Sequence, residues 1–282
     1  MRHQSFDLDV LRTFVTGVHY NSFAQAAERL GRSTSAVSAQ LKKLEDQVGS
    51  PVLERSGRGL ALTPVGEALL SQARRLLELN DEIFSSLRET QVQGTVRLGL
   101  QEDFGEHLLS DLLQRFARLY PKVSLEVHIG RSRDLLAMIA SDRVDLALAW
   151  DTGQHTPYAQ TLSETAMQWI GKAHATPFPG DAPLPLVLFD APCVLRSAAT
   201  QALDGAGIAW RVAFTSPSVA GLWAAVNAGL GVTLRTRIGL PGHLAVLTGL
   251  PAVGVLGAVL HWGAEQPPPA VKVLGGLIAD AF

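Results

Sequence analysis

Apolar residues recur every three or four positions in several segments near the start of the sequence. In residues 7–20 this spacing predicts a helix with one buried face. Residues 22–30 open with Ser-x-x-Gln, the pattern of a capping box, and predict a second helix that ends at Gly31. Residues 34–48 predict a third helix, which ends at Gly49 because glycine readily adopts the left-handed conformation of a helix terminus. The start of the chain is therefore expected to form a small helical unit.

A hairpin and a long helix are expected next. Two short apolar runs flank Arg-Ser-Gly-Arg-Gly within residues 51–62, which is typical of a small β-hairpin. Thr63 and Pro64 then provide an N-cap and a first-turn proline for a helix that reaches about residue 89. With a rise of about 1.5 Å per residue, this helix is roughly 40 Å long, more than one small domain requires.

The long helix carries a heptad pattern. The positions spaced alternately four and three apart are Leu69, Ala73, Leu76, Asn80, Ile83 and Leu87. Such a seam is typical of a coiled coil, so we expect dimerisation through it, with the polar Asn80 fixing the register. The alternative is a wider apolar stripe, including Leu70, Leu77 and Phe84, that packs on the helix's own domain. The length of the helix favours the dimer.

After Gly94 the pattern changes to alternating strands and helices. The expected strands are residues 96–100, 124–129 and 145–150, and the expected helices are residues 104–120 and 135–141. Repeated units of this kind predict a parallel sheet with right-handed crossovers. A second α/β stretch follows over about residues 162–262, and three prolines separate it from a last helix at 270–282. The fold class is therefore multidomain, a helical part followed by an α/β part.

The charge of the sequence is unevenly distributed. The formal net charge is −2, so the protein as a whole does not attract nucleic acid. Residues 29–75, in contrast, contain eight basic and four acidic residues, so any affinity for DNA must come from this local patch. Apolar residues make up 47% of the chain, which is enough to build cores in both parts.

Neither a disulfide nor a membrane segment is expected. Cys193 is the only cysteine, which fits a reducing cytoplasmic compartment, and we expect it to be a small buried side chain in a strand-like run rather than a redox sensor. The first residues place charges before any apolar run and do not resemble a signal peptide. Residues 244–262 are uncharged but hold Pro251 and several glycines, so short buried strands are expected there rather than a membrane span.

The second and third helices, with the tight turn between them, predict a helix-turn-helix that places its second helix in the major groove of DNA. The residues expected to contact DNA are Arg32, Ser33, Thr34, Ser35, Ser38, Gln40, Lys42, Lys43, Arg55 and Arg58. Hydroxyls and amides at the start of the third helix can bond base edges or phosphates, whereas Lys43 is expected at a phosphate. Arg55 and Arg58 lie on the hairpin, which would act as a wing. The alternative is that these are ordinary solvated polar faces.

Residues 8–66 resemble the DNA-binding domain of LysR-type transcriptional regulators almost position by position. The stretches that carry this resemblance are Leu11-Arg12-Thr13-Phe14, Ser22-Phe23-x-x-Ala26-Ala27-x-x-Leu30, Ser35-Ala36-Val37-Ser38-x-Gln40-Leu41-Lys42-Lys43-Leu44-Glu45, Gly49-x-Pro51-Val52-Leu53-x-Arg55 and Leu62-Thr63-Pro64-x-Gly66-Glu67. One departure is Ala39, where many family members carry an Arg or His that contacts DNA. This chain is therefore expected to rely more on Arg32, on the hydroxyls and on the wing.

The resemblance continues at lower density along the rest of the chain. Val96-Arg97-Leu98-Gly99 and Val144-Asp145-Leu146-Ala147-Leu148 are similar to the first and third strands of the family's effector domain, and residues 101–104 and 130–132 resemble an LrhA-like subgroup. The resemblance implies a winged helix-turn-helix, a long linker helix, and a C-terminal effector domain of two α/β lobes similar to a periplasmic binding protein. The implied boundaries are residues 1–63, 64–91 and 92–282, with lobe I at about 92–161 and 266–282 and lobe II at about 162–265.

Ligands of open α/β sheets bind where strands end and helices begin. The residues at such positions, and therefore expected to bind the effector, are Gln101, Glu102, Asp103, Arg131, Ser132, Trp150, Ser216 and Ser218. Arg131 favours an anionic ligand, whereas Glu102 and Asp103 favour a cationic group, so an amphoteric or aromatic acid would satisfy both. The alternative is that these side chains only cap their own helices.

The resemblance also implies the partners: double-stranded DNA, a small-molecule effector, RNA polymerase, and further copies of the chain in a homodimer or a pair of dimers. The sequence contains no His-Glu-x-x-His motif, no nucleophile elbow and no phosphate-binding loop, so neither an enzyme nor a metal or other cofactor is expected. The alternative functions are a stand-alone small-molecule binding protein and an enzyme on the same two-lobed scaffold. Residues 1–66 argue against the first of these.

Overall fold

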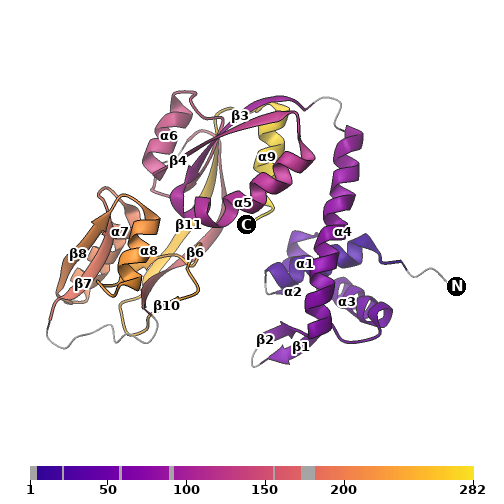
Figure 1. Cartoon of the computed structure of the whole chain (residues 1–282), viewed down its shortest axis with the longest axis horizontal. Helices are drawn as coiled ribbons and strands as arrows, with labels where there is room; N and C mark the ends of the chain where they lie inside the picture. Colours follow the sequence, from indigo (N-terminus) through magenta and orange to yellow (C-terminus); the bar gives the residue numbers. More distant parts are fainter. Residues whose placement is uncertain (1–4, 21, 57–58, 89–91, 155, 173–181) are drawn as a thin grey trace. The chain divides into compact units, whose positions relative to one another are not determined.

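The computed structural model of the chain describes residues 5–20, 22–56, 59–88, 92–154, 156–172 and 182–282 (Figure 1). The chain divides into two compact units, Met1–Gln91 and Val92–Phe282. The long helix belongs to the first unit, because it ends before the division and packs on the short helices of that unit.

The described part of the first unit consists of helices and a two-stranded hairpin. Their bounds are α1 Leu8–His19, α2 Phe23–Arg29, α3 Thr34–Val48, β1 Leu53–Ser56, β2 Gly59–Leu62 and α4 Pro64–Arg88. The side chains of Asp7, Ser22 and Ser33 accept hydrogen bonds from main-chain N–H groups in the first turns of α1, α2 and α3. Gly49 ends α3 with a φ of 80°, which other residues rarely adopt. The expected helices and hairpin are confirmed.

The core of the first unit joins α1, α3 and α4. Leu11 and Phe14 of α1 are completely buried and cluster with Leu44 of α3 and with Ala73 and Leu77 of α4. Part of α4 therefore packs on its own unit, as the alternative interpretation of its apolar stripe expects.

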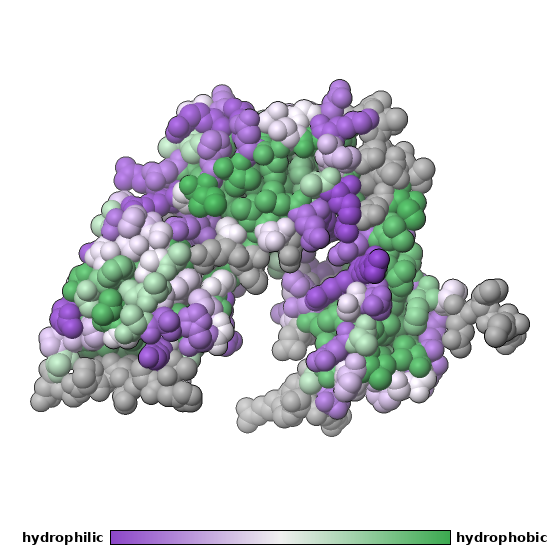
Figure 2. All heavy atoms as spheres, viewed as in Figure 1, coloured by the Kyte–Doolittle hydropathy of each residue, from purple (hydrophilic) through white to green (hydrophobic). Residues whose placement is uncertain are grey.

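The expected heptad seam on α4 divides into a buried and an exposed part. Ala73 has no exposed surface and Leu69 packs partly against the same core. In contrast, Leu76 and Ile83 are 42% and 52% exposed, and Leu79, which was not expected in the seam, is also 52% exposed. Figure 2 shows apolar atoms on the exposed side of α4. The side of α4 that is open to a partner is therefore Leu76, Leu79 and Ile83.

Asn80 forms its polar contact within the chain. Its Nδ2 donates to Oδ1 of Asp81 at 3.3 Å, and the same oxygen accepts from Arg12 of α1 at 2.8 Å. The amide is thus half-buried beside an ion pair that ties α4 to α1. The side chain of Leu87 lies outside the described residues.

The second unit alternates strands and helices. The bounds of its elements in the first half are β3 Gly94–Gln101, α5 Glu102–Leu119, β4 Val123–Gly130, α6 Ser132–Ala140, β5 Leu146–Trp150 and β6 Ala159–Lys172. Those in the second half are β7 Leu184–Phe189, α7 Val194–Gly205, β8 Trp210–Ser216, α8 Val219–Asn227, β9 Thr233–Arg235, β10 Leu244–Val246, β11 Val253–Trp262 and α9 Pro269–Ala279.

The main sheet of this unit is mixed rather than parallel. Its strand order is β10-β6-β11-β5-β3-β4, with β9 also paired to β6, while β7 and β8 form a separate parallel pair. β3 is parallel to β4 and β5, as expected. β11, however, is antiparallel to both β5 and β6. The parallel sheet expected for residues 96–100, 124–129 and 145–150 is therefore confirmed, and β11 adds an antiparallel strand because it returns from the second lobe beside β5 without a helical crossover.

Strands β6 and β11 belong to both lobes. The start of β6 pairs with β11, whereas its end pairs with β9 and β10. Residues 258–262 of β11 pair with β5 in the first lobe. The chain was expected to return to lobe I at about residue 266. The end of β11 already lies in lobe I, because residues 258–262 are hydrogen-bonded to β5.

Helices cover both faces of the sheet in lobe I (Figure 1). Phe104 and Phe116 of α5 and Leu274 of α9 pack in one core with β3 and β5. On the other face, Leu135 of α6 packs against Ala147 of β5. All of β5 is consequently buried, which explains why its sequence is a continuous apolar run.

The uncharged stretch at 244–262 forms β10 and β11, which confirms the expected short strands. Within the described ranges, every helix is too short or too polar to cross a membrane.

Candidate functional site

The N-terminal half of α3 presents a line of exposed hydroxyls. Thr34, Ser35 and Ser38 are exposed, as is the cap residue Ser33. Ser33 Oγ accepts from the N–H of Ala36 at 3.2 Å and lies 3.0 Å from Ser35 Oγ, while Ser38 Oγ donates to the carbonyl of Thr34 at 3.0 Å. The helix therefore orients these hydroxyls, and their remaining lone pairs can accept hydrogen bonds from outside.

Two of the cations expected at DNA are paired with acids at the start of α1. Arg32 lies 2.8 Å from a carboxylate oxygen of Asp9, and Lys43 Nζ lies 2.9 Å from Oδ2 of Asp7. The hydrogen bond from Lys43, followed by one from the main-chain N–H of Asp9, lowers the pKa of Asp7. Lys42 is exposed on the same helix. A phosphate at Arg32 or Lys43 would therefore compete with a carboxylate of the same unit.

The other residues expected to contact DNA are Gln40 on α3 and the two arginines of the hairpin. Gln40 is half-buried, and its Oε1 accepts a hydrogen bond from the hydroxyl of Thr13 at 2.7 Å. Arg55 lies in β1, opposite Leu60 in the ladder, so the hairpin has the form expected of a wing. Arg58 lies outside the described residues.

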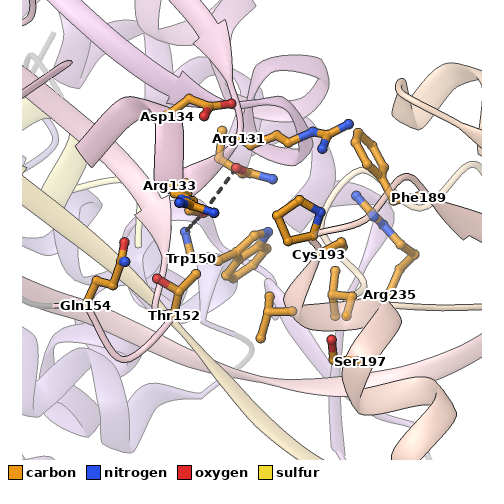
Figure 3. Close-up of a pocket in the computed structure, with 15 residues that line it drawn as sticks. Arg131, Arg133, Asp134, Trp150, Thr152, Gln154, Phe189, Cys193, Ser197 and Arg235 are labelled. Carbon is orange, nitrogen blue, oxygen red and sulfur yellow. Dashed lines mark hydrogen bonds between the residues drawn. The ribbon is translucent and has the colours of Figure 1, made fainter. Parts of the chain in front are cut away.

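A cavity of about 560 Å³ lies in the second unit between the ends of strands of the two lobes (Figure 3). Its lining from lobe I includes Gln101, Arg131, Ser132, Arg133, Asp134 and Trp150. Its lining from lobe II includes Phe189, Pro192, Cys193, Val194, Leu195 and Arg235. A cavity of this volume accommodates a small organic molecule.

Half of the expected effector-binding residues line this cavity. Ser132 connects three of them, because its Oγ donates to Oε1 of Gln101 at 3.1 Å and accepts from the main-chain N–H of Trp150 at 3.0 Å. Arg131, the fourth, immediately precedes Ser132 and points its guanidinium across the cavity (Figure 3). The ends of β3, β4 and β5 are thus tied together at one wall of the cavity.

Glu102, Ser216 and Ser218 do not line the cavity. Glu102 Oε1 accepts from the main-chain N–H of Val219 at 2.9 Å and so connects the start of α5 with the start of α8. Ser218 caps α8, and Ser216 Oγ accepts from the N–H of Ser218 at 3.1 Å. The capping alternative accounts for Ser218.

Asp103 is a buried partner of an arginine that the sequence analysis did not single out. Its Oδ1 accepts from the guanidinium of Arg235, and its Oδ2 accepts from the indole N–H of Trp150 at 2.8 Å. Both side chains of the ion pair are nearly completely buried, at 2% and 3% exposure. Asp103 therefore positions Arg235 at the wall of the cavity. The sequence feature that could have indicated Arg235 is its position as a charged residue directly after the short uncharged run Val232-Thr233-Leu234.

Three helices begin at the cavity without a side-chain cap. Their N-caps are Gln101 of α5, Arg131 of α6 and Cys193 of α7, and none of these side chains accepts a hydrogen bond from its own helix. The first N–H groups of a helix carry partial positive charge, which favours an anion at the starts of α6 and α7, whereas the first turn of α5 already holds the acids Glu102 and Asp103.

Two guanidinium groups lie against the same phenyl ring. Arg131 and Arg235 lie 5.2 Å and 5.6 Å from the ring centroid of Phe189. Arg131 also reaches Asp190 at 3.8 Å and the carbonyl of Ala191 at 3.4 Å, so it connects lobe I with lobe II. The positive edge of the cavity is therefore shared by both lobes.

Cys193 is half-buried at the start of a helix, not in a strand. The expectation of a strand-like run was wrong, because the apolar residues before it belong to β7 and the chain turns at Pro192 before α7 begins. Its side chain contacts apolar residues of two core clusters, which agrees with a packing role.

Both units match described families. Residues 8–67 match "Bacterial regulatory helix-turn-helix protein, lysR family", and residues 89–282 match "LysR substrate binding domain". The chain belongs to the LysR family. It is therefore a DNA-binding transcriptional regulator with an effector-binding domain of two α/β lobes.

Named relatives of this LysR-family chain are themselves transcriptional regulators. The regulator DgdR of Burkholderia cepacia is 36% identical over 269 residues, which cover 94% of this chain and 90% of DgdR. PecT of Dickeya dadantii is 35% identical over 243 residues, which cover 86% of this chain and 76% of PecT. These relatives do not confirm the LrhA-like subgroup.

Solved structures of LysR regulators share the fold. DarR of Vibrio fischeri in complex with DNA has a TM-score of 0.57 and 18% identity, covering 98% of this chain and 99% of DarR. Full-length CbnR complexed with its target DNA has a TM-score of 0.51 and 19% identity, covering 98% of this chain and 99% of CbnR. At this level of identity the likeness shows the fold alone.

Proposed function

We propose that this regulator reads its operator with α3 and the hairpin wing, and that a small organic effector binds in the cavity between its lobes. The observation that carries the proposal is the cavity of about 560 Å³, lined by residues from both lobes. An effector that contacts both lobes changes the stability of one lobe arrangement relative to another, which is the requirement for regulation by a population shift.

The proposed DNA contacts are Arg32, Ser33, Thr34, Ser35, Ser38, Gln40, Lys42, Lys43, Arg55 and Arg58. The exposed hydroxyls at the start of α3 suit base edges in the major groove, because hydroxyls both donate and accept. Lys42 and Lys43 suit phosphates, which set the register but carry no sequence information. Gln40 contributes mainly to the position of α3, since its carbonyl oxygen already accepts from Thr13.

We further propose that α4 forms a homodimer through Leu76, Leu79 and Ile83, and that dimers assemble in pairs. These three side chains lie on one side of the helix and are exposed in the single chain, so a second α4 would remove them from water. Two DNA-binding units would then read half-sites about one helical turn of DNA apart or a multiple of it. Contact with RNA polymerase, and residence in the cytoplasm, follow from this role as a regulator of transcription.

We assign no enzymatic activity to the cavity. In support, the matched relatives are named as regulators. Incubation of purified protein with a cavity ligand, followed by chromatography, should return the ligand unchanged. Conversion of the ligand at a rate above that of heat-denatured protein would contradict this assignment.

DNA binding to the region upstream of the protein's own gene tests the central proposal. Wild-type protein should bind saturably, protect spaced half-sites and lose affinity as salt rises. Lys42→Ala should weaken binding to all sequences and reduce the salt slope by about 1, because one phosphate contact is lost. Lys122→Ala, an exposed lysine of the second unit, is the matched control and should change neither. If the protein bound the upstream region no more tightly than unrelated DNA, the proposal would be contradicted for this operator. Genome-wide selection of bound DNA fragments would then decide whether the protein has an operator elsewhere.

A further inference from the structure

We propose that the first turn of α5 forms a fixed joint between the two lobes of the second unit, and that Arg131 forms a clasp between them that opens. The joint consists of the contacts of Glu102 and Asp103 with lobe II, and the clasp of the contacts of Arg131 with Asp190 and Ala191. This inference rests on the proposed function, because regulation by an effector requires two arrangements of the lobes.

The joint contains a buried ion pair between the lobes. Asp103 lies in the first turn of α5 in lobe I, and its Oδ1 accepts from the guanidinium of Arg235 at the end of β9 in lobe II. The two side chains are 2% and 3% exposed. Oδ2 of Asp103 accepts from the indole N–H of Trp150 at 2.8 Å, which fixes the carboxylate in lobe I. Separating the pair would leave two buried charges without a partner, which is strongly unfavourable.

Main-chain and apolar contacts surround this ion pair. Oε1 of Glu102 accepts from the main-chain N–H of Val219 at 2.9 Å, which places a carboxylate at the positive start of α8. A Cβ atom on Gly239, in the loop after β9, would lie 3.5 Å from the carbonyl oxygen of Asp103, so the two main chains approach closely. Ile238 of the same loop packs against the core of lobe I. The two lobes therefore share interior contacts at the first turn of α5.

Arg131, in contrast, reaches lobe II through contacts that are long and open to water. Its guanidinium lies 3.8 Å from Oδ2 of Asp190 and 3.4 Å from the carbonyl oxygen of Ala191. It also points toward Phe189, at 5.2 Å from the ring centroid (Figure 3). The side chains of Arg131 and Asp190 are 31% and 42% exposed. Because water can replace the polar contacts, they contribute little to stability and can open and close.

The strands that join the lobes decide which of the two connections opens. Arg235 lies directly opposite Gln168 of β6 in the β6–β9 ladder, so the joint lies beside a strand that runs through both lobes. Asp190 follows β7, which belongs to the separate β7–β8 pair. In a hinge motion, the parts beside the connecting strands move least. We therefore expect the clasp to separate while the joint stays closed.

Distances between spin labels in the full-length protein test this inference without any ligand. One pair of labels follows the joint, at Ser110→Cys on α5 and Ala224→Cys on α8. The other pair follows the clasp, at Ala137→Cys on α6 and Gln201→Cys on α7. All four positions are exposed. Cys193→Ser removes the only native thiol, and an excess of unlabelled chain restricts the signal to distances within one chain.

Arg131→Gln should open the clasp. We expect the α6–α7 distance to lengthen and its distribution to broaden, while the α5–α8 distribution keeps its wild-type mean and width. Arg143→Gln, which removes an exposed guanidinium elsewhere in lobe I, is the matched control and should change neither distribution. An unchanged α6–α7 distribution would overturn the role of Arg131, and an equal change of both distributions would overturn the fixed joint.

Glu102→Ala tests the joint itself. Asp103→Asn is less suitable, because it would leave the guanidinium of Arg235 buried without a counter-charge and is expected to impair folding. Glu102 is only half-buried, so its variant should fold, and the α5–α8 distribution should broaden. A distribution of wild-type width would overturn the assignment of Glu102 to the joint.

Operator binding by the same proteins separates this inference from the proposed function. If the label distances contradict the joint or the clasp but the wild-type protein binds its operator, only the inference about lobe motion is lost. If the wild-type protein binds no operator, the proposed function is contradicted whatever the distances show.

Discussion

The hydroxyl of Thr13 on α1 donates a hydrogen bond to Oε1 of Gln40 on α3, with 2.7 Å between the two oxygens. Thr13 has no exposed surface, and Gln40 is half-buried. This contact connects the helix that carries the proposed base contacts with α1, whose Leu11 and Phe14 are completely buried in the core of the same unit.

Replacing Thr13 with valine should weaken both folding and DNA binding. Valine has nearly the same shape but cannot donate, so Oε1 of Gln40 loses its partner and the free energy of unfolding should fall by about 1 kcal/mol. Urea denaturation and operator binding measure the two effects. Thr16→Val, at a half-buried position on the same helix, is the control. Unchanged affinity at reduced stability would show that the contact does not position α3 for DNA.

Removing the carboxylate of Asp7 should strengthen DNA binding. Lys43 is 2.9 Å from this carboxylate, which competes with a phosphate for the ammonium group. Asp7→Asn should therefore lower the dissociation constant several-fold at low salt, with the gain shrinking as salt rises. Glu28→Gln on α2 removes one exposed negative charge from another helix of the same unit and is the matched control. Equal gains from both variants would indicate general electrostatics instead of competition at Lys43.

Introducing a charge on the exposed side of α4 should dissociate the proposed dimer. Leu79 is 52% exposed in the single chain, and Leu79→Asp would place a carboxylate in the apolar contact from each of two copies. Loss of two buried leucine contacts, each about 1.5–3 kcal/mol, should raise the dimer dissociation constant by at least about a hundredfold. Analytical ultracentrifugation measures this change. Ser71→Asp, exposed on a different side of α4, should leave the mass unchanged, and an equal effect of both variants would argue against this contact.

Asp145 should make the second unit sensitive to acid. Burial tends to raise the pKa of Asp145, but hydrogen bonds from the side chain and the main-chain N–H of Arg97 lower it below its usual value of 3.8. Because the pKa is lower in the folded state, the carboxylate stabilises the fold above that usual value, and this contribution disappears as pH falls through the lowered pKa.

The test compares wild-type protein with Asp145→Asn in urea at two pH values. At neutral pH the variant should lose about 1–3 kcal/mol of unfolding free energy, because Oδ2 accepts from the N–H of Arg97 at 2.8 Å and the ion pair is lost. As the pH falls through the lowered pKa of Asp145, the difference should narrow, since the wild-type carboxylate is then protonated as well. Asp134→Asn, exposed on α6, is the control. A difference that is independent of pH would exclude an ionic contribution.

The elements that the sequence predicts well are those with local signals. Ser33 and Gly49 mark the two ends of α3 because an N-cap and a left-handed terminus depend only on nearby main chain. Gln101, Arg131, Ser132 and Trp150 could be assigned to one cavity because parallel strands bring their carboxyl ends to the same edge of the sheet.

The features that the sequence analysis missed depend on distant parts of the chain. Arg235 meets Asp103 across 132 positions, and no local pattern connects a short strand with a helix start so far away. The antiparallel placement of β11 beside β5 has the same origin, because it depends on how the chain returns from the second lobe. Leu79 was omitted from the exposed line of α4 because a heptad pattern does not reveal which side of a helix its own domain already covers.

Strands β6 and β11 run through both lobes as one hydrogen-bonded ribbon, and the register of β11 shifts between Val253 and Val255 and between Ala258 and Val259. Bulges of this kind increase local twist and allow a strand to bend. The lobes therefore cannot swing freely about a single loop, because any change in their angle has to flex the ribbon at these points. We therefore expect an effector to bend or twist these two paired strands, so that the response of the second unit depends on how readily they deform at the two register shifts.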